Sequence, residues 1–281
     1  MTPAVQQALG EATRRLAAAG VPEPRADAEV LLAHALGTDR VGVIVRATDA
    51  MDPAAAERFE ALMARREARE PVGYIVGRRE FWSLPLGVDR RVLIPRPETE
   101  LVVETALRVA PRARRILDVG TGSGAIALAL ARELPAAEVV ATDRMAPALA
   151  AAAENRDRLG PRVRLVRADL VQAFRDGAFD LVVSNPPYCA EGTVLQAEVR
   201  DWEPRSALYA GPDGLGVLRR LVRDAGRVLA PRGWLVMEMG IGQADAITER
   251  IGADGRYENV AVRCDPAGID RVIAAQRRSG R

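Results

Sequence analysis

The sequence predicts an α/β fold: a seven-stranded, mostly parallel sheet with helices on both faces, together with a small N-terminal helical domain. Two features of the sequence indicate it. From about residue 98 onward, short apolar runs alternate with segments of helical periodicity, the pattern of a parallel sheet covered by helices. Before about residue 70, apolar residues recur only at the spacing of helices.

The expected domain boundaries follow these changes of pattern. We expect residues 1–70 to form the helical domain, residues 71–95 a β-hairpin connector, and residues 96–281 the α/β domain. A chain of 281 residues is long for one domain and comfortable for two. The chain can therefore bury a sizeable core.

Three helices are expected in the N-terminal region. The first covers the apolar positions from Val5 to Leu16, and the second those from Ala28 to Ala35. The third, Glu57–Arg69, follows the helix-start signal Asp52-Pro53. In the connector, Tyr74–Val76 and the aromatic and apolar run from Phe81 to Val88 predict short strands or a hairpin.

Strands and helices then alternate through the α/β domain. The expected strands are Arg115–Val119, Glu138–Thr142, Val163–Arg167, Phe179–Val183, Trp234–Glu238, Tyr257–Val262 and Asp270–Ala274. The expected helices are Leu101–Val109, Ala125–Leu134, Ala146–Leu159, Leu215–Leu229 and Gln243–Ile251. The last two strands are joined by a short connection, so we expect them to be antiparallel neighbours.

The composition excludes several kinds of chemistry. The chain has one histidine, His34, and no lysine, so all 40 basic residues are arginine. This argues against lysine Schiff bases, a P-loop lysine, histidine-rich metal sites and most histidine-dependent triads, and no metal is expected. Two cysteines make no disulfide framework, and no signal peptide or membrane-spanning run is evident, so the cytoplasm is the expected location.

A glycine-rich loop follows the first strand of the expected sheet. It is the segment Asp118-Val119-Gly120-Thr121-Gly122-Ser123-Gly124, and it opens a helix whose free N–H groups suit a ligand. Asp143 ends the next strand and can accept hydrogen bonds from ribose hydroxyls, while Asp169 follows the third strand and can accept from an exocyclic amine. A nucleotide-like cofactor is therefore expected.

The glycine spacing leaves two cofactor classes open. Gly120, Gly122 and Ala125 satisfy the dinucleotide fingerprint, which favours a nicotinamide cofactor. Gly124 gives the tighter loop that is typical of S-adenosylmethionine sites. A glycine-rich turn with no ligand is the third interpretation.

The most informative segment is Asn185-Pro186-Pro187-Tyr188, which follows a buried strand. Its prolines donate no backbone hydrogen bond and fix a stiff loop with free carbonyls. The Asn185 carbonyl and the Tyr188 ring complete a holder for a planar NH₂ group. The alternative is a structural Asn-Pro turn at a strand end.

Together these motifs resemble class I methyltransferases that act on a planar nitrogen. Asn-Pro-Pro-Tyr is typical of amino methyltransferases of adenine, guanine and glutamine amides. Further segments are similar to the glutamine methyltransferases of peptide chain release factors, namely Tyr74–Gly77, Phe81–Leu84, Val92–Glu100, Trp202–Leu208 and Gly211–Leu215. The resemblance covers nearly the whole chain and is weakest before residue 70.

The resemblance implies a Rossmann-like class I methyltransferase that uses S-adenosyl-L-methionine. It implies methylation of the side-chain N5 of glutamine in the Gly-Gly-Gln motif of class I release factors, by a monomer with no direct need for nucleic acid or membrane. The implied cofactor-binding residues are Gly120, Thr121, Gly122, Ser123, Gly124, Asp143, Asp169, Leu170 and Asn185. The implied catalytic residues are Asn185, Pro186 and Tyr188, and the implied substrate-binding residues are Asn185, Pro186, Pro187 and Tyr188.

One position departs from the family pattern, and two other functions remain open. Some members have an aromatic residue where this chain has Leu170, which implies thinner packing on adenine. A nucleic-acid amino methyltransferase acting on adenine N6 or guanine N2 is the alternative enzyme, although no basic reading surface is evident in residues 1–94. A non-catalytic binding module that docks through its helical domain is the alternative from another class.

Overall fold

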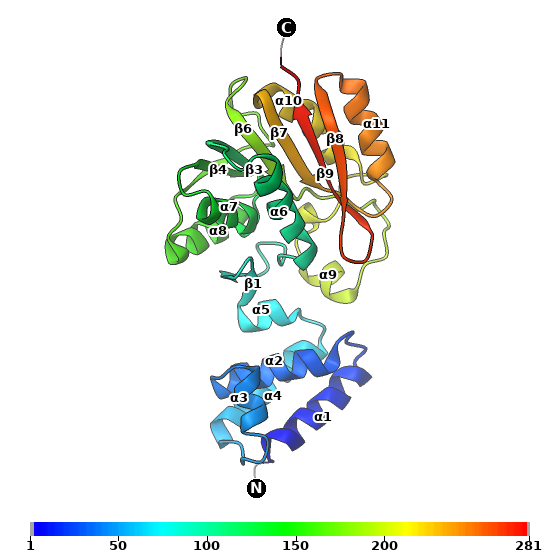
Figure 1. The fold of residues 1–281 in the computed structure, drawn as a ribbon. Coiled ribbons are helices and arrows are strands. Elements are labelled where there is room, and N and C mark those ends of the chain that lie inside the picture. The colour runs from blue at the N-terminus through cyan, green and yellow to red at the C-terminus, as the bar shows by residue number, and fades with distance from the viewer. Residues whose placement is uncertain (1–2, 280–281) are drawn as a thin grey trace. The chain divides into compact units, whose positions relative to one another are not determined.

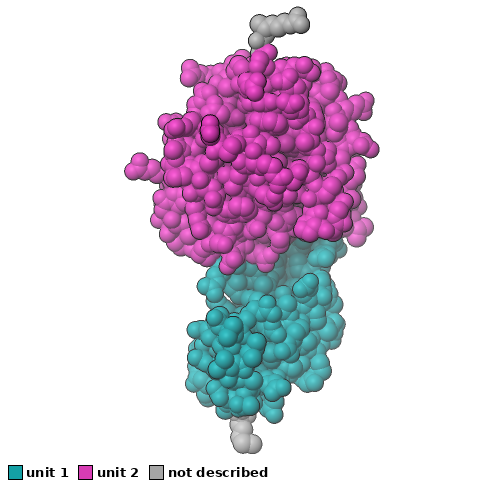
Figure 2. Space-filling view, in the orientation of Figure 1, with its two compact units in different colours: residues 1–78, 195–202 teal, residues 79–194, 203–281 magenta. Residues whose placement is uncertain are grey.

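The computed structural model describes residues 3–279 and divides the chain into two compact units. Unit 1 comprises residues 1–78 and 195–202, and unit 2 comprises residues 79–194 and 203–281 (Figure 2). Segment 195–202 lies far along the sequence from the rest of unit 1. A stretch within the expected α/β domain therefore packs with the helical unit, which no local pattern in the sequence indicated.

Unit 1 consists of helices (Figure 1). They are α1 (Val5–Ala18), α2 (Pro24–Leu36), α3 (Arg40–Val45), α4 (Pro53–Glu67), α5 (Val72–Val76) and α9 (Ala197–Trp202). Pro24 and Pro53 each begin a helix, where the missing N–H costs nothing, and the Asp52 carboxylate caps α4 by accepting from the N–H of Ala55. Leu16, Leu31, Leu32 and Met63 are fully buried in its core.

The expected strand at Tyr74–Val76 was wrong, because these residues form part of α5. Tyr74 and Ile75 are both buried, so the run is apolar throughout and its periodicity cannot separate a strand from a short helix. The expected hairpin is confirmed by β1 (Arg78–Phe81) and β2 (Leu84–Gly87), which form a two-stranded sheet. Trp82 and Ser83 turn the chain between them, both with positive φ.

Unit 2 contains the seven-stranded sheet, in the order β5-β4-β3-β6-β7-β9-β8 (Figure 1). The strands are β3 (Arg115–Val119), β4 (Glu138–Asp143), β5 (Val163–Arg167), β6 (Phe179–Ser184), β7 (Leu229–Glu238), β8 (Tyr257–Cys264) and β9 (Asp270–Arg277). The helices are α6 (Glu100–Val109), α7 (Ala125–Glu133), α8 (Ala146–Leu159), α10 (Gly216–Val228) and α11 (Ala244–Asp254), with short 3₁₀ turns η1 (Pro97–Thr99) and η2 (Arg205–Ala207). Each strand and helix expected for this region is present, some with the expected ends and the others with ends that differ by a few residues.

The pairing of the strands confirms the expected fold class. Strands β3 to β7 are parallel to their neighbours, and β9 is antiparallel to both β7 and β8. One apolar cluster, containing Ile116 and Leu181, includes side chains of α6 and α7, and the other, containing Leu117 and Val182, includes those of α10 and α11. The strand order reverses between β3 and β6, and a sheet of this kind binds ligands at the carboxyl ends of the strands beside such a reversal.

Candidate active site

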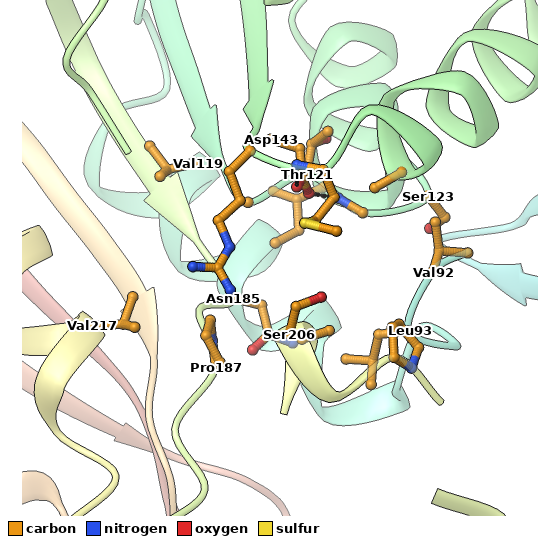
Figure 3. Close-up of a pocket in the computed structure, with 18 of the residues that line it drawn as sticks. Val92, Leu93, Val119, Thr121, Ser123, Asp143, Asn185, Pro187, Ser206 and Val217 are labelled. Carbon is orange, nitrogen blue, oxygen red and sulfur yellow. Dashed lines mark hydrogen bonds between the residues drawn. The ribbon is translucent and has the colours of Figure 1, made fainter. Parts of the chain in front are cut away.

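A pocket of about 1150 Å³, counting its open mouth, lies at the carboxyl ends of β3, β4, β5 and β6. Figure 3 shows Thr121 and Asp143 on one side of it, Asn185 and Pro187 on the facing side, and Leu93 at a third. Apolar side chains supply much of the remaining wall: Val92, Val119, Ile126, Met145, Ala148, Leu170 and Val217. Polar groups at the rim of a largely apolar pocket are typical of small-molecule sites.

The glycine loop holds its shape through backbone hydrogen bonds. The N–H groups of Gly120 and Thr121 both donate to the Thr142 carbonyl at 2.8 Å, so the loop is fastened to the end of β4. Gly120 and Gly122 have φ of 73° and 55°, which a residue with a Cβ adopts only with strain. An added Cβ at either would meet no protein atom within 4 Å, so both leave free space where the loop lines the pocket.

Asp118 supports this loop from inside the protein. Its side chain is buried, and Oδ2 accepts hydrogen bonds from the Thr121 hydroxyl at 2.6 Å and the Ala127 N–H at 3.2 Å. Its other oxygen, Oδ1, is buried without a hydrogen-bond partner. Burial raises the pKa of Asp118 to about 7, against an ordinary value of 3.8, because a half-satisfied carboxylate is costly away from water.

We expect Asp118→Asn to weaken the pH dependence of stability of unit 2. Because the folded state raises this pKa, Asp118 stabilises the fold most fully below pH 3.8, and that stabilisation is lost as pH rises through 7. Between pH 5 and pH 8 the loss in the wild-type protein is on the order of 2 kcal/mol. Urea unfolding at both pH values measures it, with Asp245→Asn, a change at an exposed aspartate, as control. Equal pH dependence of wild type and Asp118→Asn would contradict this expectation.

Asp143 is held at the end of β4 with its carboxylate beside the loop. Oδ2 accepts from the Gly122 N–H at 3.1 Å, and Oδ1 accepts from the Met145 N–H at 2.9 Å. Burial raises the pKa of Asp143, and these two backbone donors oppose that rise. Each oxygen has accepting capacity left, so the carboxylate can take two further hydrogen bonds from a diol.

Asp169 and Leu170, which follow β5, also line the pocket. Asp169 Oδ2 accepts from Arg220 at 2.6 Å, and both side chains are about two-fifths exposed. Leu170 has a φ of +51°, and its carbonyl accepts from the Thr142 hydroxyl at 3.3 Å. Leu170 thus occupies a strained backbone position at the pocket wall. The carboxylate of the preceding residue, Asp169, is already hydrogen-bonded to Arg220.

The Asn-Pro-Pro-Tyr loop leaves β6 on the opposite side. Asn185 Nδ2 donates to the Thr99 hydroxyl at 2.9 Å. Asn185 and Pro187 line the pocket, whereas Pro186 between them is buried. Tyr188 is packed on the core cluster of β6 and β7, and its hydroxyl donates to Glu238 Oε1 at 3.0 Å. The loop is thus anchored at both of its ends by side-chain hydrogen bonds.

The rim of the pocket is closed by two segments that an ion pair joins. Arg96 donates to the buried Glu203 carboxylate, which also accepts from the Ile94 N–H at 3.4 Å. Burial raises the pKa of Glu203, and the charge of Arg96 opposes that rise. The segment around Leu93 is therefore fixed against the segment that contributes Pro204 and Ser206 to the same pocket.

The structure brings most of the expected site residues to one pocket. Those that line it are Gly120, Thr121, Gly122, Ser123, Asp143, Asp169, Leu170, Asn185 and Pro187. Gly124, Pro186 and Tyr188 do not contribute to its lining. Sequence reasoning did not assign roles to Thr99 and Glu238, which hold Asn185 and Tyr188. The available signal was an acidic residue ending an apolar strand, at Glu238.

Residues 3–279 contain neither a membrane-spanning helix nor a cluster of metal-binding side chains. No helix of this part of the chain is long and apolar enough to span a bilayer. In the same residues, no cluster of three or more His, Cys, Asp or Glu side chains is arranged to hold a metal ion.

Comparisons with known proteins agree with this architecture. A family model described as the PrmC N-terminal domain matches residues 7–77, and one described as the methyltransferase small domain matches residues 97–201. The release factor glutamine methyltransferase of Geobacter sulfurreducens is 45% identical over 263 residues, 93% of this chain and 92% of that protein. The protein of the same description from Moorella thermoacetica is 46% identical over 280 residues, 98% of this chain and 99% of that protein.

A solved structure supports the fold. A methyltransferase from Pyrococcus furiosus aligns with a TM-score of 0.55 and 19% identity, over 78% of this chain and 98% of that one. At this identity the likeness bears on the fold alone.

Proposed function

Because the chain belongs to the release factor glutamine methyltransferase family, we propose that it methylates the side-chain N5 of a release-factor glutamine. The methyl donor is S-adenosyl-L-methionine, and the target is the glutamine of the Gly-Gly-Gln motif in class I release factors. The observation that carries the proposal is the pocket itself. In it Asn185 and Pro187 lie opposite the glycine loop and Asp143, which supports an amide-holding role for the first pair and a ribose-binding role for Asp143.

The residues of the glycine-loop side fit this cofactor. Positive-φ glycines leave room beside the loop, Asp143 retains accepting capacity for both ribose hydroxyls, and Met145 and Leu170 offer apolar surface to an adenine ring. When bound, S-adenosyl-L-methionine would supply an electrophilic methyl group to the amide nitrogen, which would then release a proton to water, with the thioether as the leaving group. Binding of the cofactor and orientation of the substrate amide are the work of the protein's own side chains and backbone groups.

We expect Asp143→Ala to weaken cofactor binding by about 1–3 kcal/mol, the usual cost of removing a buried hydrogen-bonding partner. The loss has two sources, since the carboxylate both receives the ribose and fixes the Gly122 N–H. Calorimetric titration with S-adenosylhomocysteine measures it. Asp143→Asn is the matched variant, because it keeps one acceptor and should lose less. Unchanged affinity in Asp143→Ala would place the ribose elsewhere.

The facing loop positions the substrate amide. An amide nitrogen is a weak nucleophile because its lone pair is delocalised into the carbonyl. Hydrogen bonds from its NH₂ to Asn185 Oδ1 and to the Pro186 carbonyl orient that lone pair toward the methyl group. Such alignment is worth on the order of 7–11 kcal/mol in favourable cases, which suits a chain with one histidine and no lysine. Tyr188 is proposed to bound the glutamine side chain.

The charge distribution favours a protein substrate over a nucleic acid. Many arginines are paired with acids, including Arg15 with Glu67, Arg65 with Glu70 and Arg115 with Asp180. Paired arginines contribute little to a long-range positive field. The nucleic-acid amino methyltransferase remains the second candidate, since Asn-Pro-Pro-Tyr suits any planar NH₂ group.

One labelling experiment tests the proposed function. The full-length protein is incubated with methyl-labelled S-adenosyl-L-methionine and either a class I release factor, the same factor with the motif glutamine changed to alanine, or bulk DNA and RNA. We expect label in the unaltered release factor alone. Label confined to nucleic acid would replace the proposal by its alternative. Label that survives loss of the motif glutamine would place the reaction at another residue.

A further inference from the structure

Four side chains from distant parts of unit 2 form one hydrogen-bonded chain beneath the Asn-Pro-Pro-Tyr loop. Asn185 Nδ2 donates to Thr99 Oγ1 at 2.9 Å, and Thr99 Oγ1 donates to Glu238 Oε2 at 2.6 Å. Tyr188 donates through its hydroxyl to Glu238 Oε1 at 3.0 Å. Thr99 and Glu238 are 3% and 2% exposed, so solvent competes little for these hydrogen bonds.

The chemistry of these groups fixes which atom donates and which accepts in each of these hydrogen bonds. Each carboxylate oxygen of Glu238 accepts from one hydroxyl, Oε2 from Thr99 and Oε1 from Tyr188, and each hydroxyl has a single proton to donate. Burial raises the pKa of Glu238, and the hydrogen bonds from Thr99 and Tyr188 and the charge of Arg271 oppose that rise without cancelling it. With its own proton committed to Glu238, Thr99 Oγ1 can only accept from Asn185.

This arrangement of donors and acceptors fixes which end of the Asn185 amide faces the pocket. The NH₂ group must point at Thr99, which leaves the carbonyl oxygen, Oδ1, on the other side of the same planar group. No hydrogen bond from another residue to Oδ1 is found within the described chain. Asn185 itself lines the pocket, so the free acceptor is presented where the proposed substrate NH₂ must be held.

We propose that Thr99 and Glu238 are positioning residues that lock Asn185 with its carbonyl oxygen toward the substrate nitrogen. This inference rests on the proposed function for its chemistry, although the orientation of Asn185 is a property of the protein alone. A reversed amide would present NH₂ to the substrate NH₂, and two donors cannot form a hydrogen bond. The hydrogen bonds from Asn185 to Thr99 and from Thr99 to Glu238 therefore favour the productive orientation of the Asn185 amide over the reversed one.

The first test replaces the Thr99 hydroxyl. We expect Thr99→Val, which keeps the shape of the side chain, to lower kcat on the order of 10- to 100-fold, since misplaced groups cost rates of this size. Thr99→Ser restores the hydroxyl and should keep kcat within about threefold of wild type, and affinity for S-adenosylhomocysteine should change little in either variant. The matched control is Thr105→Val in α6, the helix that follows Thr99, because the buried Thr105 hydroxyl has no hydrogen-bond partner.

A double-mutant cycle separates positioning from a merely structural role. If Thr99 acts through Asn185, Thr99→Val should lower kcat no further in the Asn185→Ala background. Multiplied losses in the double variant, or a normal kcat in Thr99→Val, would overturn the inference.

A third readout does not depend on activity. The side-chain amide resonances of Asn185, assigned by their absence in Asn185→Ala, should show hydrogen bonding in wild type and lose it in Thr99→Val. If the wild-type protein fails to methylate a release factor while these resonances behave as expected, the proposed function fails and the assigned orientation stands. Resonances unchanged by Thr99→Val would refute the orientation itself.

Discussion

Asn185→Ala is expected to lower kcat for glutamine methylation on the order of 10²-fold or more, with affinity for S-adenosylhomocysteine changed far less. Loss of one contact that stabilises or orients groups in the transition state typically costs this much. An interaction realised mainly in the transition state reduces kcat rather than ground-state binding. Single-turnover kinetics with a release factor measures the first quantity, and calorimetry the second.

Asn185→Asp separates hydrogen-bond accepting from correct orientation. A carboxylate still accepts from the substrate NH₂, but it cannot donate to Thr99. The single Thr99 proton then faces two acceptors, the new carboxylate and Glu238. The added negative charge also stabilises a cationic ground state. We expect both variants to fold, to bind cofactor and to methylate poorly, and near-normal turnover by Asn185→Ala would show that the loop is only structural.

Glu198→Ala is expected to destabilise unit 1 by about 3 kcal/mol, because it strips a buried arginine of a charge partner. Glu198 accepts from Arg66 at 2.8 Å and from Arg69 at 2.7 Å, and Arg66 also donates to Asp27 at 2.7 Å. The Arg66 side chain is 4% exposed, so water cannot replace the lost carboxylate. Hydrogen exchange of α4 amides, with urea unfolding followed by circular dichroism, measures the effect.

The matched control is Glu11→Ala, which removes an exposed ion pair with Arg14 and should change stability much less. Acid should also reduce the effect of Glu198→Ala. Burial by itself raises the pKa of Glu198, but hydrogen bonds from Arg69 and Arg66 outweigh it and lower the pKa to about 2. The stabilisation is therefore present above pH 4.5 and lost as pH falls toward 2. A pH-independent difference, or one no larger than that of the control, would contradict this account.

Local sequence patterns were sufficient to predict the helices and strands whose ends are set by neighbouring residues in the sequence. Helix Ala146–Leu159 and strand Arg115–Val119 were predicted with their observed ends, because a proline or charged residue marks the start and a glycine or turn the end. The Tyr74–Val76 run was misassigned because a short, wholly apolar segment carries no periodicity that separates helix from strand.

The sequence by itself determined the sheet, the edge of the sheet at which the pocket lies and several of the residues that line it. Alternating patterns fix the order of strands and helices, and parallel strands necessarily bring Gly122, Asp143 and Asn185 to one edge. Only the tertiary structure decided how these groups are held. Thr99 and Glu238 are 139 positions apart, and Arg66 and Glu198 are 132 apart, so no local spacing couples them. Their pairing arises because burial forces each polar group to find a partner that the fold, rather than the neighbouring sequence, places within reach.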